Sequence, residues 1–222
     1  MKRNHEPIVL ADVRAAHALR KKQIRKRLAE FRKVWREGSD AQLFEELVFC
    51  IFTAGASAKM GYRSIEATRS LLLDGKQEDL TLALRTAGAH RFPVERPGYI
   101  VVTRAYLHEH CDFALRKKLQ SFDDPVERRD WLAQEKRIKG LGYKEASHFL
   151  RNVGFKGHAI LDKHVMSCLT DLRVVENKKP PATRARYLET ELRLKEFATD
   201  VGIDFEELDL VLWSMKTGEV LK

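Results

Sequence analysis

Apolar residues recur at helical spacing along nearly the whole chain, and this periodicity constrains the fold more than any other feature of the sequence. Residues spaced i, i+3, i+4 and i+7 lie on one face of a helix and can be buried together. The alternation of apolar and polar residues between turns that predicts a β-strand is nearly absent. The sequence therefore predicts an all-α fold.

Local signals indicate where the helices begin. Ser39 with Gln42 three residues later forms a capping-box pattern, so a helix should start at Asp40. Asp124 before Pro125 marks a second start, because proline at the first helical position loses no hydrogen bond. The expected helices cover residues 8–35, 40–54, 58–73, 78–86, 98–110 and 125–137, a helix from about residue 144, two that follow residues 162 and 181, and 204–215.

The composition fits a folded protein with a polyanionic partner. Of 222 residues, 44% are hydrophobic and 33% charged, and 41 Lys and Arg outnumber 32 Asp and Glu, for a net charge of +9. Such a balance favours DNA, RNA or acidic lipid, and charge alone does not reject the alternative of a ribosome-associated or merely soluble basic protein. The apolar run at residues 47–52 is too short to span a bilayer, and the first residues do not resemble a signal peptide.

Three cysteines, Cys50, Cys111 and Cys168, are widely spaced, which is typical of reduced thiols in a cytoplasm. They cannot supply the four ligands of an all-cysteine iron–sulfur cluster. The segment His108–Cys111 resembles a metal site, but neighbouring and alternate residues diverge on a helix. We therefore expect a cytoplasmic protein without a metal or cofactor.

A short hairpin connects two of the expected helices, with the sequence IKGLGYKEA at residues 138–146. Gly140 and Gly142 flank Leu141, which allows a tight turn and leaves backbone N–H groups uncovered. The following helix directs the positive end of its dipole the same way, so the site suits a DNA phosphate. One face of that helix is expected to be buried, at residues 146, 149, 150 and 153.

This hairpin and the residues after it resemble the helix–hairpin–helix DNA glycosylase superfamily. That superfamily has an Asp-x-His-Val sequence beyond the hairpin, here Asp162–Val165, and its bifunctional members begin the second hairpin helix with a lysine, here Lys144. The sequence is most similar to the archaeal-type 8-oxoguanine DNA glycosylase/AP lyases, which lack both an N-terminal β-sheet domain and an iron–sulfur cluster. Their usual closing sequence corresponds to WSMKTGEVLK at residues 213–222.

The resemblance runs from about Gln42 to the last residue and implies one glycosylase domain over residues 1–222. Its hairpin motif would cover about 125–154. The N- and C-terminal segments would form one helical subdomain and residues of about 60–165 the other, with a basic DNA-binding cleft between them. The implied partner is double-stranded DNA containing 8-oxoguanine, bound by a cytoplasmic, nucleoid-associated monomer.

In this family the lysine attacks the sugar C1′ as a neutral amine, so Lys144 is the implied nucleophile. A lysine in water has a pKa near ~10.4, and a helix N-terminus in a partly desolvated cleft disfavours its ammonium form. Asp162 would stabilise the cationic sugar and help to move protons. An ordinary helix N-cap is the alternative for Asp162, and the two roles are compatible.

The resemblance also implies residues that contact the DNA backbone and the damaged base. The backbone contacts would come from Lys139, Gly140, Leu141, Gly142 and His164, although a histidine satisfied within its helix is an equal alternative for the last. Trp213 would line the pocket for the extruded base, against the alternative of a core tryptophan. The carboxylate of the terminal Lys222 would accept the N7–H that distinguishes 8-oxoguanine from guanine.

Several points stay open at this stage. After the first apolar helix the family usually has a glutamine-containing turn, whereas this chain has Gly55 within Thr53–Lys59, which bears on how the opposite base is contacted. Another damaged base is an alternative substrate, and a non-enzymatic helix–hairpin–helix DNA-binding protein or a basic RNA-binding protein are alternative classes. The basic run at residues 20–27 is either a DNA-contacting stripe or a solvated helix face.

Overall fold

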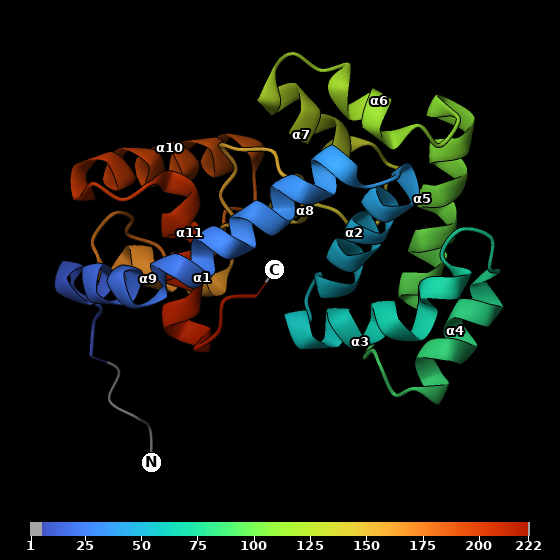
Figure 1. Cartoon of the computed structure of the whole chain (residues 1–222), viewed down its shortest axis with the longest axis horizontal. Helices are drawn as coiled ribbons and strands as arrows, with labels where there is room; N and C mark the ends of the chain where they lie inside the picture. The colour runs from blue at the N-terminus through green and yellow to red at the C-terminus, as the bar shows by residue number, and fades with distance from the viewer. Residues whose placement is uncertain (1–5, 222) are drawn as a thin grey trace. The chain divides into compact units, whose positions relative to one another are not determined.

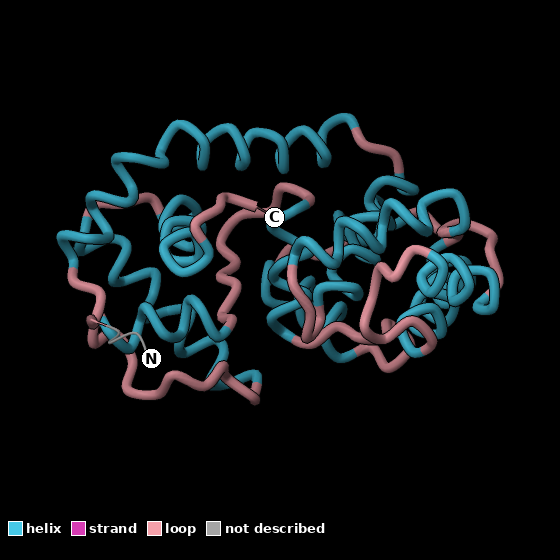
Figure 2. The backbone as a smooth tube through the Cα atoms, turned by 90° about the horizontal axis from the view of Figure 1, so that it is seen from below, coloured by secondary structure: helices cyan, strands magenta, loops and turns pink. Residues whose placement is uncertain are grey.

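The computed structural model describes residues 6–221, and all regular structure in that range is helical (Figures 1 and 2). The elements are α1 (Leu10–Glu37), α2 (Asp40–Thr53), α3 (Ala58–Thr68), the 3-10 turn η1 (Arg69–Leu71), α4 (Gln77–Thr86), α5 (Glu95–Cys111), α6 (Leu115–Gln120), α7 (Pro125–Gln134), α8 (Tyr143–Asn152), α9 (Lys163–Asp171), α10 (Arg184–Val201) and α11 (Phe205–Thr217). The prediction of an all-α fold is confirmed.

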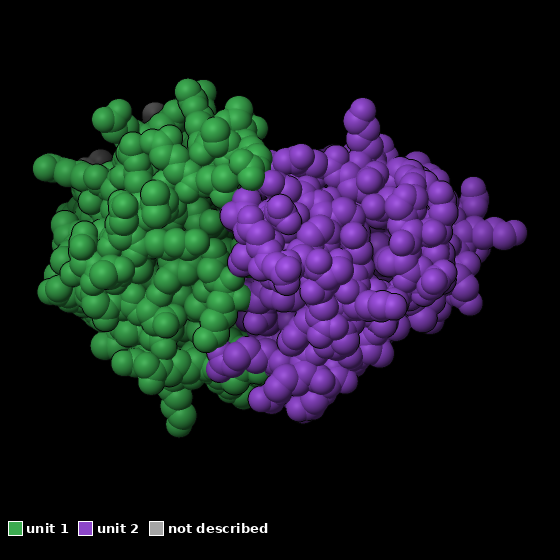
Figure 3. Space-filling model, turned by 90° about the horizontal axis from the view of Figure 1, so that it is seen from above, with its two compact units in different colours: residues 1–30, 156–222 green, residues 31–155 purple. Residues whose placement is uncertain are grey.

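The chain divides into two compact units, coloured separately in Figure 3. Unit 1 comprises Met1–Glu30 and Lys156–Lys222, and unit 2 comprises Phe31–Phe155. The long helix α1 contributes residues to both units, because the division falls between Glu30 and Phe31. The hairpin motif lies wholly within unit 2.

The core of unit 2 is built around α2, which packs against α3, α5, α6 and α8. Its residues from Leu43 to Phe52 are buried with the exception of the half-buried Glu45. The expected capping box is present: the hydroxyl of Ser39 accepts from Gln42 N at 3.3 Å, and Gln42 Oε1 accepts from Ser39 N at 2.8 Å. These bonds fix the start of the helix that positions the rest of the unit.

Unit 1 packs α9 and α10 against α11, together with the N-terminal part of α1 (Figure 1). Two side chains of α1 bind the buried carboxylate of Glu207 in α11: His17 Nε2 lies 2.6 Å from one oxygen, and Arg25 Nε donates to the other at 2.5 Å. Burial raises the pKa of Glu207, but the bonds from His17 and Arg25 outweigh it and hold that pKa below its usual value.

The structure differs from the sequence-based helix boundaries at several places. Helix α3 ends at Thr68 rather than near residue 73 and is followed by the 3-10 turn η1. Helix α5 begins at Glu95, three residues before the expected start, because Pro97 is tolerated in a first turn. Helix α6 was not predicted, since it has only six residues and no side-chain cap. Helix α7 ends at Gln134 rather than at the expected residue 137.

Within residues 6–221 no helix is long and apolar enough to span a membrane.

Candidate active site

The hairpin lies between α7 and α8, and Thr103 of α5 holds its first residues by two hydrogen bonds to the backbone. The Thr103 hydroxyl accepts from Lys139 N at 3.0 Å and donates to Arg137 O at 3.3 Å. Leu141 is buried, whereas Lys139 and Gly142 are exposed. In the described part of the chain no protein acceptor is recorded for the backbone N–H groups of Gly140 and Leu141. The hairpin therefore presents uncovered donors beside an exposed lysine, as a phosphate site requires.

Gly140 could not be replaced by a residue with a side chain without strain. Its φ is +79°, and a Cβ atom there would lie 2.8 Å from the ring of Tyr99 and 3.3 Å from Arg96 Nη1. Arg96 in turn donates from Nη2 to Ala54 O at 2.9 Å and lies over the rings of Phe92 and Tyr99. Sequence reasoning missed Arg96, a buried residue that contacts both the hairpin and the turn after α2.

Lys144 is the second residue of α8, which begins with Gly142 as its N-cap. Its Nζ lies 2.8 Å from Oε1 of Glu145, and both side chains are partly buried, at 27% and 14% exposure. The other Glu145 oxygen, Oε2, accepts from Gly142 N at 3.3 Å. The predicted buried face of α8 is confirmed, with Ala146, Phe149, Leu150 and Val153 fully buried. Sequence reasoning did not identify Glu145.

Asp162 is the N-cap of α9 in unit 1. Its Oδ1 accepts hydrogen bonds from His164 N and Val165 N, each at 2.8 Å. Among the described residues no hydrogen bond is recorded for Oδ2. One oxygen therefore fixes the carboxylate at the positive end of the helix, and the other remains available for chemistry.

The segment before Asp162 is held by buried polar side chains of α10 and α11. Ala159 N donates to Glu191 at 2.8 Å and Ile160 N donates to Asp209 at 3.1 Å. The Tyr187 hydroxyl accepts from Leu161 N at 3.3 Å and donates to Ala159 O at 2.7 Å. Because these partners are almost fully buried, the segment is fixed on the core, and with it the position of the Asp162 carboxylate.

The other candidate residues of unit 1 lie on α9 and α11. His164 is half-buried in the first turn of α9. Trp213 is half-buried on α11 beside Leu212, which is fully buried. Trp213 is thus not sealed in the core, and a ring that stacks on a ligand has to meet that condition. Lys222 lies outside the described residues.

The sequence matches the family model for 8-oxoguanine DNA glycosylase over residues 24–203. The chain belongs to this family. The matched range contains the hairpin, Lys144 and Asp162, whereas Trp213 lies beyond it. The superfamily expected from the hairpin motif is confirmed.

Individual relatives in the 8-oxoguanine DNA glycosylase family cover nearly the whole chain. A protein of Korarchaeum cryptofilum named 8-oxoguanine DNA glycosylase/AP lyase is 43% identical over 199 residues, covering 90% of each chain. The solved Methanocaldococcus jannaschii 8-oxoguanine glycosylase/lyase, in complex with DNA containing 8-oxoguanine, superposes with a TM-score of 0.86 at 34% identity and covers 96% of this chain and 99% of its own. The 8-oxoguanine DNA glycosylase of Thermotoga maritima gives a TM-score of 0.85 at 33% identity, covering 96% and 98%.

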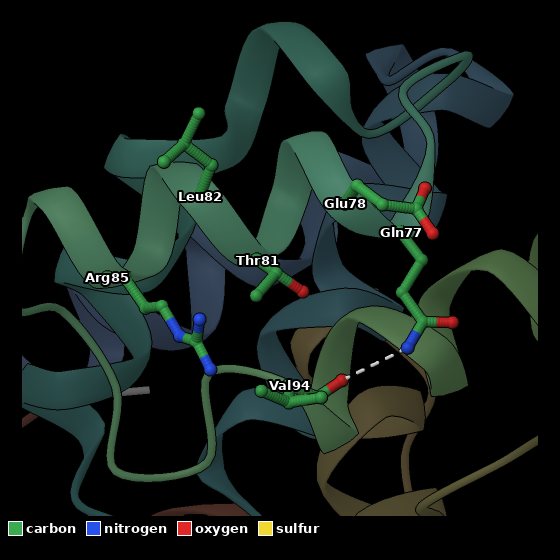
Figure 4. Close-up of a pocket in the computed structure, with 6 residues that line it drawn as sticks. All are labelled: Gln77, Glu78, Thr81, Leu82, Arg85 and Val94. Carbon is green, nitrogen blue, oxygen red and sulfur yellow. Dashed lines mark hydrogen bonds between the residues drawn. The ribbon is translucent and has the colours of Figure 1, made fainter.

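An open pocket of about 360 Å³ lies elsewhere in unit 2, on α4 and the loop before α5 (Figure 4). Figure 4 shows Arg85 and Gln77 reaching toward the loop residue Val94, whose carbonyl oxygen accepts from Gln77 Nε2 at 3.4 Å. The other lining residues are Glu78, Thr81 and Leu82. None of the candidate site residues lines this pocket, so it is separate from the hairpin chemistry.

The metal-like segment on α5 is engaged by neighbouring side chains. Arg137 Nη1 donates to Glu109 Oε2 at 2.7 Å, and its Nη2 contacts the His110 ring at 2.9 Å. His108 stacks on Phe113 with ring centroids 4.6 Å apart. Glu109 and His110 thus share Arg137 as a partner, whereas His108 packs on a different residue.

Proposed function

We propose that this protein is a base excision repair enzyme that removes 8-oxoguanine from duplex DNA and then cleaves the strand. The observation that carries the proposal is Lys144 at the N-terminus of the hairpin helix in a chain of the 8-oxoguanine DNA glycosylase family. Its relatives at 43% and 37% identity are named 8-oxoguanine DNA glycosylase/AP lyase, which supports both activities.

In the proposed reaction the neutral amine of Lys144 attacks C1′ of the damaged nucleotide. The C1′–N9 bond breaks, and the base leaves with the bonding electrons and takes up a proton. Asp162 stabilises the positive charge that develops on the sugar, with the oxygen that its helix cap leaves available. Opening of the sugar ring gives a Lys144 imine, and loss of a 2′ proton then expels the 3′ phosphate by β-elimination.

The proposed DNA contacts place a phosphate at the hairpin, against the N–H groups of Gly140 and Leu141 and near Lys139. The exposed lysine and the uncovered donors support this arrangement. The half-buried Trp213 is proposed to stack on the extruded base and His164 to contact a phosphate. Lys222 is proposed to recognise the oxidised base.

The protein is proposed to act as a monomer on cytoplasmic DNA. Support for a reducing compartment comes from the cysteines, since Cys50 and Cys168 are buried and Cys111 is half-buried. Burial raises the pKa of Cys168 to about 11, so this thiol stays protonated and unreactive. Light scattering of the purified protein alone and with duplex DNA tests the monomer, with a dimer mass as the contrary result.

The experiment that tests the proposed activity uses a duplex with a single 8-oxoguanine and follows base and strand separately. Mass spectrometry should detect free 8-oxoguanine, and a denaturing gel without alkali should show a break 3′ to the lesion. The same duplex with guanine at that position is the control. If 8-oxoguanine stays in place and a duplex with another damaged base loses that base instead, the protein acts on a different lesion.

A further inference from the structure

Glu145 makes two contacts that compete with the proposed roles of its neighbours, one with the amine of Lys144 and one with the N–H of Gly142. Its Oε1 lies 2.8 Å from Lys144 Nζ, in the one ion pair that the described residues form with this lysine. An amine held in this ion pair has to leave the carboxylate before its nitrogen can reach a sugar C1′. Lys144 and Glu145 are nevertheless neighbours on α8, the helix that carries the proposed nucleophile.

The second contact concerns the hairpin. Glu145 Oε2 accepts the N–H of Gly142, at a long 3.3 Å. Gly142 is exposed, and its N–H follows directly on the uncovered N–H groups of Gly140 and Leu141, where a phosphate is proposed to bind. The carboxylate thus occupies, in the free protein, a donor that a DNA phosphate would use.

We propose that Glu145 is a positioning residue that holds Lys144 in the free protein and releases it when a DNA phosphate takes the Gly142 N–H. Two anions cannot share one N–H donor, and their repulsion moves the flexible carboxylate away. Lys144 loses its partner in the same step, so its amine is freed where DNA is bound. This inference rests on the proposed function of Lys144 and the hairpin.

The substitution Glu145→Gln separates the two contacts. Glutamine is also a capping-box residue, and its amide oxygen can still accept from Gly142 N, so α8 keeps its start. The neutral amide no longer pairs with the Lys144 ammonium. The matched control is Glu127→Gln, which removes the same charge from an exposed position in the first turn of α7, the end of that helix away from the hairpin.

The first readout is the reactivity of Lys144 in the free protein. Reductive methylation with formaldehyde and cyanoborohydride modifies neutral amines, and peptide mass spectrometry reports each lysine. We expect Lys144 to react about twofold to fivefold faster in Glu145→Gln than in wild type, the range set by a partly exposed ion pair. Lys139 provides an internal control and should react equally in both proteins.

The second readout is the affinity for undamaged duplex DNA at low salt. Glu145→Gln should bind about twofold to fivefold more tightly than wild type, because the neutral amide at the Gly142 N–H does not repel an incoming phosphate as the carboxylate does. Glu127→Gln should gain less. If Glu145→Gln does not fold, Glu145→Asp replaces it: the carboxylate is one methylene shorter, and Lys144 should react at a rate between wild type and the expected glutamine value.

Two results would overturn the inference: equal labelling of Lys144 in wild type and variant, or a Glu145→Gln affinity no higher than that of Glu127→Gln. Failure of the proposed function has a different signature. If Lys144→Gln still forms a borohydride-trapped adduct with damaged DNA, Lys144 is not the nucleophile, whatever Glu145 does. If that adduct is lost while both Glu145 readouts are unchanged, only the inference about Glu145 fails.

Discussion

Asp162 accepts the backbone N–H of Val165 through Oδ1 at 2.8 Å, and His164 N binds the same oxygen. The carboxylate is therefore fixed by its helix cap before any substrate arrives. In the described residues its second oxygen has no recorded hydrogen bond. One side chain can serve as both cap and catalytic carboxylate, and the two roles can be separated by substitution.

Asp162→Asn should keep the cap and lose the chemistry. Asparagine caps helices about as well as aspartate, so the free energy of unfolding should change little, whereas excision should slow by about 10²- to 10³-fold with the charge gone. Asp162→Ala should slow excision equally and also cost about 1 kcal/mol of stability. Urea denaturation and single-turnover excision measure the two effects. Wild-type excision by Asp162→Asn would contradict a catalytic role.

Tyr187→Phe should displace the carboxylate of Asp162 indirectly, through the segment that precedes it. The Tyr187 hydroxyl binds Leu161 N and Ala159 O, and its removal leaves two buried backbone groups unsatisfied, at a cost of about 1–3 kcal/mol. Because a small misplacement of a catalytic group lowers the reaction rate strongly, single-turnover excision should slow by about tenfold or more. A loss of stability with unchanged excision would show that the segment does not position the carboxylate.

The parts of the site that follow local rules could be predicted from the sequence. The buried face of α8, the capping box at Ser39 and the cap at Asp162 each depend on residues within one or two turns of the chain. Side-chain hydrogen bonding and helical spacing fix such features wherever the helix lies in the fold. Lys144 was predicted from the family resemblance, since it opens the helix that follows the hairpin glycines Gly140 and Gly142.

Gly140→Ala should damage the hairpin more than an ordinary glycine substitution. It combines a φ of +79° with a Cβ placed 2.8 Å from the Tyr99 ring, so it should cost about 1–3 kcal/mol and weaken DNA binding. Gly88→Ala is the matched control in unit 2, since Gly88 also has a positive φ, +54°, but nothing within 4 Å of its Cβ. Equal losses of stability and affinity in both variants would contradict the packing argument.

His90 should make the protein less stable as the pH falls. Its Nε2 lies 2.8 Å from Phe52 O, and its Nδ1 accepts from Phe92 N at 3.0 Å, so the ring is neutral with its proton on Nε2. Burial, with a smaller effect of the Arg96 charge, lowers the pKa of His90. The folded state therefore binds the proton less readily than the unfolded state, and the stabilisation is present above the unfolded pKa of about 6.5 and is lost as the pH falls below it.

The test of this pH dependence compares wild type with His90→Gln by urea denaturation at about pH 7.5 and about pH 5.5. The wild type should lose more stability over this interval than the variant, which has no titrating group at this position. Parallel losses in the two proteins would assign the pH dependence to other residues.

The remaining features depend on contacts between distant parts of the chain. Arg96 reaches Ala54, Thr103 reaches Lys139, and Tyr187 reaches Leu161, and no local pattern specifies such partners. A weak signal did exist for Asp209, a charged residue inside the apolar run Leu208–Leu212 that is buried in the structure. An isolated acid in such a run implies a buried hydrogen-bond partner, though not which one.

The most direct test of the account is borohydride trapping on duplex DNA with a single 8-oxoguanine, followed by peptide mapping of the adduct. Wild type should give one covalent complex, with the sugar remnant on Lys144, and Lys144→Gln should give none. Lys139→Gln, which removes the neighbouring exposed charge, should bind DNA more weakly but still form the adduct. An adduct that persists in Lys144→Gln, or maps to another residue in wild type, would contradict the assignment of Lys144 as the nucleophile.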